Sequence, residues 1–328
     1  KKVSEHLTPS RAIASQLAAF TWSREVPDRI ILTELLSGPS LFKPCALRAP
    51  DGKTIVGAKI VSVRPSNAAL TPPLPTVPAT ILLLDDATGA LTTLIDGTLL
   101  TAIRTAAGSA LATQRLRSGK TTSSLVVFGA GLQGLQHARH ILHSFPSITS
   151  VKIMNRSEPR ALAACASLAA EFAKFEEGEA KAFECVLLSA RPGVRAAVEG
   201  ADVICLCTNS SEPLFEAAWL KEGCHINGVG SYTPDMQEVD TGTVGRCEKV
   251  VLDSFEALPV GDIAKALDAG AVKREELFEL AEILQGEQQG SGPEGCTFFK
   301  SVGLASQDIA AAGFLLDALE AGEGVTDK

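Results

Sequence analysis

The sequence lacks the features of a membrane protein and of a nucleic-acid-binding protein. Its longest apolar runs, such as residues 81–84 and 124–128, are far shorter than the roughly 20 residues that a membrane-spanning helix needs. Positive charge is not in excess, because the sequence has 30 Lys and Arg residues and 38 Asp and Glu residues, which give a net charge of -8. Such a chain has no general basic field for a polyphosphate. We therefore expect a soluble protein with no membrane or nucleic-acid partner.

Paired cysteines are also missing. The eight cysteines are scattered along the chain and form no C-x-x-C pair, so a metal centre or a redox motif is disfavoured. Cys205 and Cys207 are two residues apart among apolar neighbours, which is typical of buried thiols on one face of a strand. We expect reduced cysteines, no bound metal and a cytoplasmic location.

The chain does contain a change of pattern near residue 120. Its 328 residues, of which 45% are hydrophobic, suffice for one large domain or two. From about residue 120, short β-branched runs alternate with Ala-rich stretches, as in the βα units of a parallel sheet. The predicted strands are 124–128, 151–154, 203–207, 225–228 and 250–253, and the predicted helices are 132–143, 158–174 and 215–222. This pattern predicts an α/β fold with a Rossmann-type, doubly wound parallel sheet.

The first 120 residues have a different pattern. Residues 53–63, 80–85 and 89–95 alternate apolar with polar side chains between Pro- and Gly-rich turns, which indicates an antiparallel sheet. Helices are predicted over 99–117 and 305–321 from their three-to-four spacing of apolar residues. We therefore expect a second α+β domain over 1–119, a Rossmann domain over 120–303, and a segment over 304–328 whose helix returns to the first domain.

A glycine-rich motif follows the first predicted strand of the Rossmann domain. Gly129, Gly131 and Gly134 form G-x-G-x-x-G at the start of a predicted helix, the context in which this motif binds a dinucleotide. The first glycine permits a tight turn, the second lets the backbone approach a pyrophosphate, and the third allows the helix to pack closely on the strand. The N–H groups of Leu132 and Gln133 would then bind the anion. A glycine turn without a ligand is the alternative.

The end of the next predicted strand indicates which dinucleotide is bound. NAD sites usually carry an acidic residue here for the ribose 2′-hydroxyl, whereas this strand ends in Asn155, Arg156 and Ser157. A guanidinium with two small polar side chains suits a 2′-phosphate. We therefore expect NADP(H) as the preferred cofactor, with NAD(H) possible. In the alternative interpretation, Arg156 is a solvated charge and Asn155 caps the following helix.

Five further segments, in order along the chain, resemble one family. They are Gly57-Ala58-Lys59, Leu94-Ile95-Asp96-Gly97, Leu100-Thr101-Ala102-Ile103-Arg104-Thr105-Ala106-Ala107, His225-Ile226-Asn227-Gly228-Val229-Gly230-Ser231 and Phe299-Lys300-Ser301-Val302-Gly303-Leu304. Together with the glycine loop they resemble the ornithine cyclodeaminase/mu-crystallin family. The resemblance implies a homodimer whose first domain supplies the dimer sheet and the substrate pocket.

The resemblance also implies roles for individual residues. Basic side chains matching Arg29, Lys59 and Arg104 would bind the carboxylate of an amino or imino acid, and a nearby lysine can also deliver a proton. For each, a surface or interdomain ion pair is the alternative. Residues that would line the cofactor are Thr76, Thr105, Gln133, Val229 and Ser301. The candidate cofactor-binding set also includes Thr208 and Gly230, which follow two predicted strands.

One position separates branches of the family. Cyclodeaminases carry an Asp where this sequence has Tyr232, its only tyrosine. The resemblance is therefore closer to the branch that reduces cyclic ketimines, such as Δ1-pyrroline-2-carboxylate or Δ1-piperideine-2-carboxylate, with Tyr232 a candidate substrate contact. Alternatives are an ornithine cyclodeaminase with bound NAD, a dehydrogenase making alanine or an N-substituted amino acid, and a non-catalytic NADPH-dependent binding protein like mu-crystallin.

Overall fold

The computed structural model describes residues 3–33, 37–174, 180–286 and 292–322. The chain forms two compact units, the first comprising residues 1–108 and 303–328 and the second residues 109–302. The division falls inside helix α3 (Gly97–Leu116), which therefore contributes residues to both units. Within the described ranges, no helix combines the length and the apolar character that spanning a bilayer requires.

The first unit is built on an antiparallel sheet, as the alternating pattern predicts. Its strands are β1 (Ser23–Glu25), β2 (Ile30–Leu32), β3 (Ser40–Arg48), β4 (Thr54–Ser62), β5 (Ala79–Leu84) and β6 (Leu91–Asp96). They pair in the order β1-β3-β4-β5-β6, with β2 also paired to β3. Its helices, apart from the start of α3, are α1 (Val3–His6), α2 (Pro9–Thr21) and α10 (Ala305–Glu320). Residues 323–328 of the predicted returning segment lie outside the described residues.

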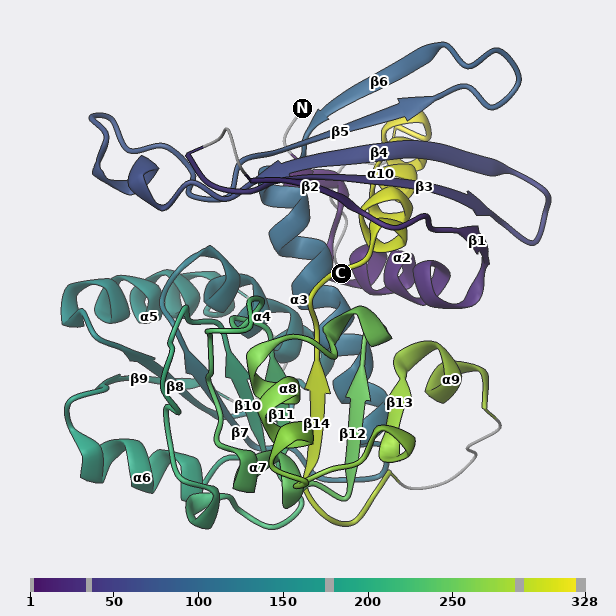
Figure 1. The fold of residues 1–328 in the computed structure, drawn as a ribbon. Coiled ribbons are helices and arrows are strands. Elements are labelled where there is room, and N and C mark those ends of the chain that lie inside the picture. Colours follow the sequence, from purple (N-terminus) through teal and green to yellow (C-terminus); the bar gives the residue numbers. More distant parts are fainter. Residues whose placement is uncertain (1–2, 34–36, 175–179, 287–291, 323–328) are drawn as a thin grey trace. The chain divides into compact units, whose positions relative to one another are not determined.

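Helix α10 packs on one face of this sheet (Figure 1). Two glycines allow the close approach: a Cβ on Gly57 would lie 3.1 Å from Ile309 Cδ1, and one on Gly313 would lie 2.4 Å from Ile55 Cδ1. Leu100 and Ile103 of α3 complete the buried core of the unit. The C-terminal helix therefore belongs to the same core as strands that precede it by more than 200 residues, as the resemblance implies.

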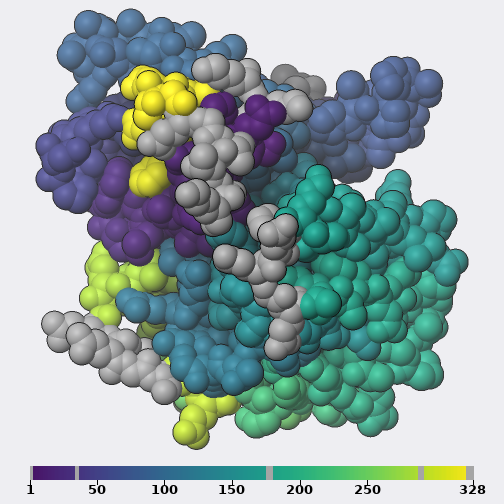
Figure 2. Space-filling view, turned by 180° about the vertical axis from the view of Figure 1, so that it is seen from behind, coloured from purple at the N-terminus to yellow at the C-terminus, as the bar shows by residue number. Residues whose placement is uncertain are grey.

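A long loop between β4 and β5 projects from the first unit (Figure 2). It contains a short 3₁₀ turn, η1 (Pro65–Ala69). Leu70 and Leu74 are about half exposed, at 47% and 52%. The Pro-rich composition that marks this stretch as a turn in the sequence is therefore found in an exposed loop.

The second unit is an α/β unit around a fully parallel sheet. Its strands are β7 (Ser124–Phe128), β8 (Ser150–Asn155), β9 (Ala182–Leu187), β10 (Val203–Leu206), β11 (His225–Gly228), β12 (Lys249–Leu252), β13 (Leu277–Glu279) and β14 (Thr297–Lys300). Its helices are α4 (Leu132–Ser144), α5 (Glu158–Phe172), α6 (Arg191–Glu199), α7 (Thr241–Gly245), α8 (Gly261–Asp268) and α9 (Leu280–Gln285). The predicted Rossmann-type sheet is confirmed.

The strand order predicts where a ligand would bind to this sheet. The order is β13-β12-β14-β11-β10-β7-β8-β9, so the chain runs outward from β7 to β9 and then returns to add β10 on the other side. In open parallel sheets, ligands bind outside the carboxyl ends of the strands at such a reversal. This rule therefore predicts a ligand site where β7 and β10 end.

The helix predicted over residues 215–222 is wrong. The structure has only a 3₁₀ turn there, η2 (Ala217–Trp219). Phe215, Trp219 and Leu220 are all buried in the core of the unit. A segment this short gains little from helix formation because nucleation is costly, so the burial of its large side chains determines its path.

Three histidines are buried in the second unit, namely His137, His140 and His225. His140 of α4 and His225 of β11 are 2% and 0% exposed. Burial lowers the pKa of His140 to about 4 and that of His225 to about 3. Both side chains therefore fold in the neutral form.

We expect the protein to lose stability in mild acid. In the unfolded chain a histidine has a pKa of about 6.5. Below this pH the unfolded chain binds protons that the folded chain does not bind, so the free energy of unfolding falls. At pH 5.5 His140 and His225 should each contribute a loss of about 1.4 kcal/mol relative to pH 8. Urea unfolding at both pH values measures this, and His140→Leu should remove about half of the loss. An unchanged pH dependence in that variant would contradict the assignment.

Candidate functional site

The glycine loop connects β7 to α4 with the geometry expected of a dinucleotide-binding turn. Gly129 has φ +108°, and a Cβ there would lie 2.5 Å from the Cys207 carbonyl oxygen. A Cβ on Gly134 would lie 1.9 Å from the Gly129 carbonyl oxygen, because helix and turn are in close contact. Only glycine fits at these two positions.

Gly131 has space around it instead. A Cβ at this position would have no atom within 4 Å. Gly131 is also the N-cap of α4 and has no side chain, so the first N–H groups of the helix, including those of Leu132 and Gln133, have no side-chain cap. Within the described residues, Gln133 Oε1 is buried and accepts no hydrogen bond. Open space before uncapped helical N–H groups fits the pyrophosphate of a dinucleotide.

Asn155 is the last residue of β8, which is paired with β7, the strand that leads into the glycine loop. Arg156 and Ser157 follow it. The Asn155 side-chain amide donates to the Ser157 carbonyl oxygen at 3.0 Å, which shapes the turn into α5. Arg156 is exposed, and so is Arg160 in the first turn of α5. Arg160 was not predicted from the sequence, although it lies only four residues after Arg156.

The other predicted cofactor residues of this unit lie beyond the ends of three neighbouring strands. Thr208 follows β10, Val229 and Gly230 follow β11, and Ser301 follows β14. Because these strands are adjacent and parallel to β7, the structure brings all four residues to the same edge as the glycine loop. Tyr232 lies in the loop after β11 and is 41% exposed, and burial of the rest of its ring raises its pKa.

In the first unit, Lys59 and Arg104 meet at one buried carboxylate. Lys59 Nζ lies 2.6 Å from Asp308 Oδ2, and Arg104 Nε lies 2.8 Å from Asp308 Oδ1. The exposed fractions of the three residues are 1%, 4% and 0%. Arg104 also donates from Nη1 to Gln307 Oε1 at 3.0 Å. The two predicted substrate-binding cations are therefore neighbours, oriented by α10.

Two more residues complete this cluster. Lys43 of β3 is paired directly with Lys59 of β4 in the sheet register, is 5% exposed and donates to the Gly303 carbonyl oxygen at 2.6 Å. A Cβ on Gly303 would lie 2.7 Å from Arg104 Nη2, so the backbone lies against the guanidinium. Like charges on directly paired residues are unfavourable, which makes the Asp308 carboxylate necessary to the cluster.

The cluster shifts the pKa values of its members. Burial, together with Arg104 and Lys43, lowers the pKa of Lys59 well below its usual range, against the attraction of Asp308. The pKa of Asp308 is lowered because Arg104, Lys59 and Lys43 outweigh the effect of its burial. Asp308 is therefore ionised, and Lys59 releases a proton more readily than an exposed lysine.

The remaining predicted residues of the first unit are Arg29, Thr76 and Thr105. Arg29 immediately precedes β2 and is partly buried, and Thr76 lies exposed in the projecting loop before β5. Thr105 follows Arg104 on α3, is 5% exposed and donates its hydroxyl to the Thr101 carbonyl oxygen at 2.7 Å. Their roles in binding stay predictions.

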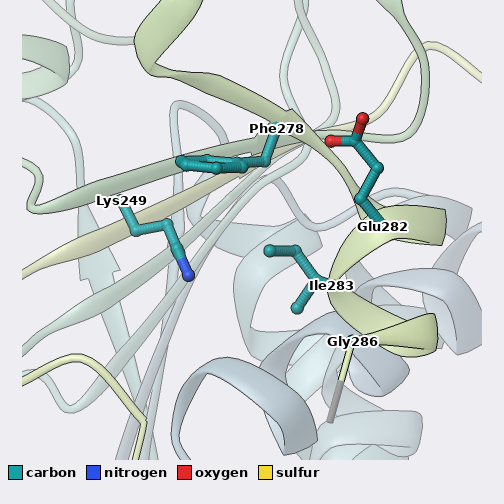
Figure 3. A pocket seen from close by; sticks show the side chains of 5 residues that line it. All are labelled: Lys249, Phe278, Glu282, Ile283 and Gly286. Carbon is teal, nitrogen blue, oxygen red and sulfur yellow. The ribbon is translucent and has the colours of Figure 1, made fainter. Parts of the chain in front are cut away.

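A separate pocket, with a volume of about 450 Å³, lies beside β12, β13 and α9 (Figure 3). Lys249 Nζ lies 5.0 Å from the ring centroid of Phe278, and Ile283 points toward the same space (Figure 3). Lys249 begins β12, so it lies at the amino ends of the strands. Ligands of parallel sheets bind at the carboxyl ends, and we therefore do not assign catalysis to this pocket. Across the described residues, no group of three or more His, Cys, Asp or Glu side chains could hold a metal ion.

These features define a class of protein: a Rossmann-type dinucleotide-binding unit joined to an antiparallel-sheet unit that holds a buried cation cluster. The chain belongs to the ornithine cyclodeaminase/mu-crystallin family, whose model matches residues 45–323. The resemblance seen in the sequence is thereby confirmed.

Several of the relatives carry the names of reductases. A Δ1-pyrroline-2-carboxylate reductase from Bacillus cereus is 34% identical over 279 residues, covering 84% of this chain and 81% of the relative. The ketimine reductase mu-crystallin of Macropus fuliginosus is 33% identical over 250 residues, covering 76% and 72%. The structure of Thermococcus litoralis Δ1-pyrroline-2-carboxylate reductase in complex with NADH and L-proline has 30% identity and a TM-score of 0.85, covering 99% and 97%.

Proposed function

We propose that this protein is an NAD(P)H-dependent reductase of small cyclic imino acids such as Δ1-pyrroline-2-carboxylate. The observation that carries the proposal is the buried Lys59 and Arg104 pair on Asp308, in a chain whose other unit has an open dinucleotide loop. The similarity to named Δ1-pyrroline-2-carboxylate and ketimine reductases supports it. In this assignment the second unit binds the nucleotide and the first binds the substrate.

Arg104 binds and orients the substrate carboxylate. A guanidinium has five N–H donors in a rigid fork, and contacts with Asp308 and Gln307 use only part of it. The remaining donors match a carboxylate in the two-bond geometry that arginine favours. Fixing the carboxylate fixes the adjacent C=N carbon, which removes much of the entropy cost of the reaction.

Lys59 supplies the proton. A bound reduced nicotinamide would supply a hydride to the C=N carbon, and the imine nitrogen would need one proton for the product to be a neutral secondary amine. The lowered pKa of Lys59 makes its ammonium a stronger acid than that of an exposed lysine, which suits a general acid. Asp308 holds the ammonium in place. A bound water is the alternative donor.

The preferred cofactor is NADP(H). The exposed Arg156 at the end of β8 supports this preference, since a guanidinium accommodates a 2′-phosphate and this strand end carries no acid for a 2′-hydroxyl. Arg160 adds a second exposed cation in the first turn of α5. NADPH should therefore give a higher kcat/KM than NADH with the same imine.

A spectrophotometric screen tests the function. Oxidation of NADPH and NADH is followed by the loss of absorbance of the reduced nicotinamide, with five- and six-membered cyclic imines, with ornithine, and with pyruvate plus ammonia. Rapid oxidation with a cyclic imine supports the reductase. Ammonia release from ornithine without added NADH would identify a cyclodeaminase instead, turnover with pyruvate and ammonia an alanine dehydrogenase, and cofactor binding without any turnover a binding protein.

The protein should be a homodimer that associates through the sheet of the first unit. The face opposite α10 carries apolar side chains, among them Phe42, Pro44, Ala46, Val56, Ala58, Ile60, Leu82, Leu84 and Leu94. No described element of the unit covers this face (Figure 1), and Leu94 is 66% exposed. Apolar surfaces of this extent usually mark an interface.

Sedimentation velocity tests the dimer. The wild-type protein should sediment as a dimer at micromolar concentration, and Leu82→Glu should sediment as a monomer because a charge at the centre of an apolar interface is strongly unfavourable. Lys53→Glu, at a position outside this face, is the matched control and should leave the dimer intact. A wild-type monomer at all concentrations would contradict the proposal.

The proposed location is the cytoplasm. All eight cysteines are free thiols, as is usual in reducing compartments. Burial raises the pKa of Cys45 and Cys205 to about 12, so these thiols stay protonated and unreactive.

A further inference from the structure

A buried carboxylate that the proposed chemistry does not use lies between two loops at the carboxyl ends of the parallel strands. Glu238 is 0% exposed. Its Oε1 accepts hydrogen bonds from the Thr208 backbone N–H and the Thr208 hydroxyl, both at 2.7 Å. Its Oε2 accepts from the N–H groups of Gly230 at 2.7 Å and Ser231 at 3.1 Å. One side chain therefore joins the loop after β10 to the loop after β11.

The two loops are packed closely where Glu238 joins them. A Cβ on Gly230 would lie 1.8 Å from the Thr208 carbonyl oxygen and 2.6 Å from Glu238 Oε1, so these backbones touch. Four donors converge on the two carboxylate oxygens, and a carboxylate is the side chain that accepts at both oxygens without donating. The position of each loop thus depends on the same group.

The backbone of Glu238 is fixed by a buried ion pair. Its backbone N–H donates to Asp262 Oδ1 at 2.7 Å, and Asp262 Oδ2 pairs with Lys300 Nζ at 2.8 Å. Asp262 is 1% exposed and Lys300 0% exposed. A buried ion pair with further hydrogen bonds is rigid and keeps its geometry, so Glu238 has little freedom to move.

The strand order indicates which part of a dinucleotide meets these loops. The pyrophosphate belongs at the start of α4, and the adenosine ribose belongs at the end of β8, on one side of β7. The other half of the dinucleotide must then cross to the opposite side, where β10 and β11 end. That half carries the nicotinamide.

We propose that Glu238 is a positioning residue for the nicotinamide half of the cofactor, acting through the loops at Thr208 and Val229–Ser231. This inference rests on the proposed dinucleotide-dependent function. A change at Glu238 should therefore be selective. It should weaken the interactions of the protein with the nicotinamide half of the cofactor and leave the binding of the adenine half unchanged.

Glu238→Gln tests this selectivity by calorimetric titration with NADPH and with 2′-phospho-ADP-ribose, which lacks the nicotinamide. In either orientation of the amide, its NH₂ group faces at least one backbone N–H donor, that of Thr208 or those of Gly230 and Ser231, so one loop must shift. We expect the Kd for NADPH to rise about tenfold or more, and the Kd for 2′-phospho-ADP-ribose to stay within about twofold of wild type. kcat with a cyclic imine should fall as well.

Asp202→Asn is the matched control. Asp202 is also a buried carboxylate, 6% exposed, and its Oδ2 accepts from the N–H groups of Ser123 and Ser124. It directly precedes β10, at the amino ends of the strands. This variant should lower the melting temperature but should not change the ratio of the two Kd values. A ratio shifted equally in both variants would overturn the proposal, because instability alone would then explain the effect.

Thr208→Val keeps the proposal testable if Glu238→Gln does not fold. It removes one of the four hydrogen bonds and keeps the backbone N–H. NADPH affinity should fall about threefold with 2′-phospho-ADP-ribose unchanged, and no change would overturn the proposal. If wild-type protein binds neither nucleotide, the proposed function itself fails. If wild type binds both and the variants affect both equally, only the role of Glu238 fails.

Discussion

Arg104→Ala should lower kcat/KM for Δ1-pyrroline-2-carboxylate by about 10³-fold or more and leave the Kd for NADPH within about twofold. Arg104 is 4% exposed, and its planar guanidinium is a hydrogen-bond donor within the buried cluster. Alanine can neither bind a carboxylate nor orient the imine carbon. Steady-state kinetics and calorimetric titration measure the two quantities. Arg104→Lys should restore only a small part of the activity, because an ammonium lacks the fork.

Arg117→Ala separates this role from stability. Arg117 immediately follows the same helix and is also 4% exposed, but its Nη1 donates to the carbonyl oxygens of Asp202 and Gly223, at the amino ends of the parallel strands. This control should lower the melting temperature and keep kcat/KM per folded molecule within a few-fold. Equal losses of activity and NADPH binding in Arg104→Ala would instead indicate a structural Arg104.

Gly131→Ala should weaken NADPH binding by about 100-fold without changing the melting temperature. Gly131 has φ -90°, which alanine adopts freely, and a Cβ meets no atom within 4 Å of its position. The added methyl group would occupy the space that a pyrophosphate needs in order to reach the N–H groups of α4. Calorimetric titration and thermal unfolding measure the two effects independently.

Two other glycines serve as comparisons. Gly134→Ala should lower the melting temperature, because its Cβ would lie 1.9 Å from the Gly129 carbonyl oxygen. Gly200→Ala, at the C-cap of α6 with φ -95°, should change neither binding nor stability. Normal NADPH affinity in Gly131→Ala would show that no pyrophosphate approaches this loop.

Local signals in the sequence were sufficient for the class of the parallel sheet and for five of its strands, whereas β9, β13 and β14 were not predicted. The predicted strands 124–128 and 225–228 coincide with β7 and β11, since buried parallel strands are continuous apolar runs bounded by turns. The wrongly predicted helix over 215–222 has helix-forming residues too, but tertiary burial of Phe215 and Trp219 outweighs that propensity.

The buried charges were harder to predict, because their partners are distant in the chain. Lys43 becomes a neighbour of Lys59 only through the register of β3 on β4, and strand register is not encoded locally. Asp308 was missed although it lies on a helix whose other residues are mostly apolar or small. An acid on the buried face of a predicted helix is a signal that could have found it.

Glu238 illustrates the same limit. Its four hydrogen bonds come from residues 208, 230 and 231, which are predicted separately as strand ends but not as neighbours of one carboxylate. The glycine pattern around Gly230 indicates a close approach of backbones, yet it does not identify the group that holds them. A buried partner of this kind can be identified from the folded structure but not from the sequence motif.

The account depends on transfer of a hydride from reduced nicotinamide to the imine carbon of a small cyclic imino acid. The most direct measurement uses NADPH carrying deuterium at both C4 positions, with Δ1-pyrroline-2-carboxylate as substrate and mass spectrometry of the product. We expect proline with one deuterium, located at the α-carbon by NMR. Proline without deuterium, or no proline despite bound NADPH, would contradict the account.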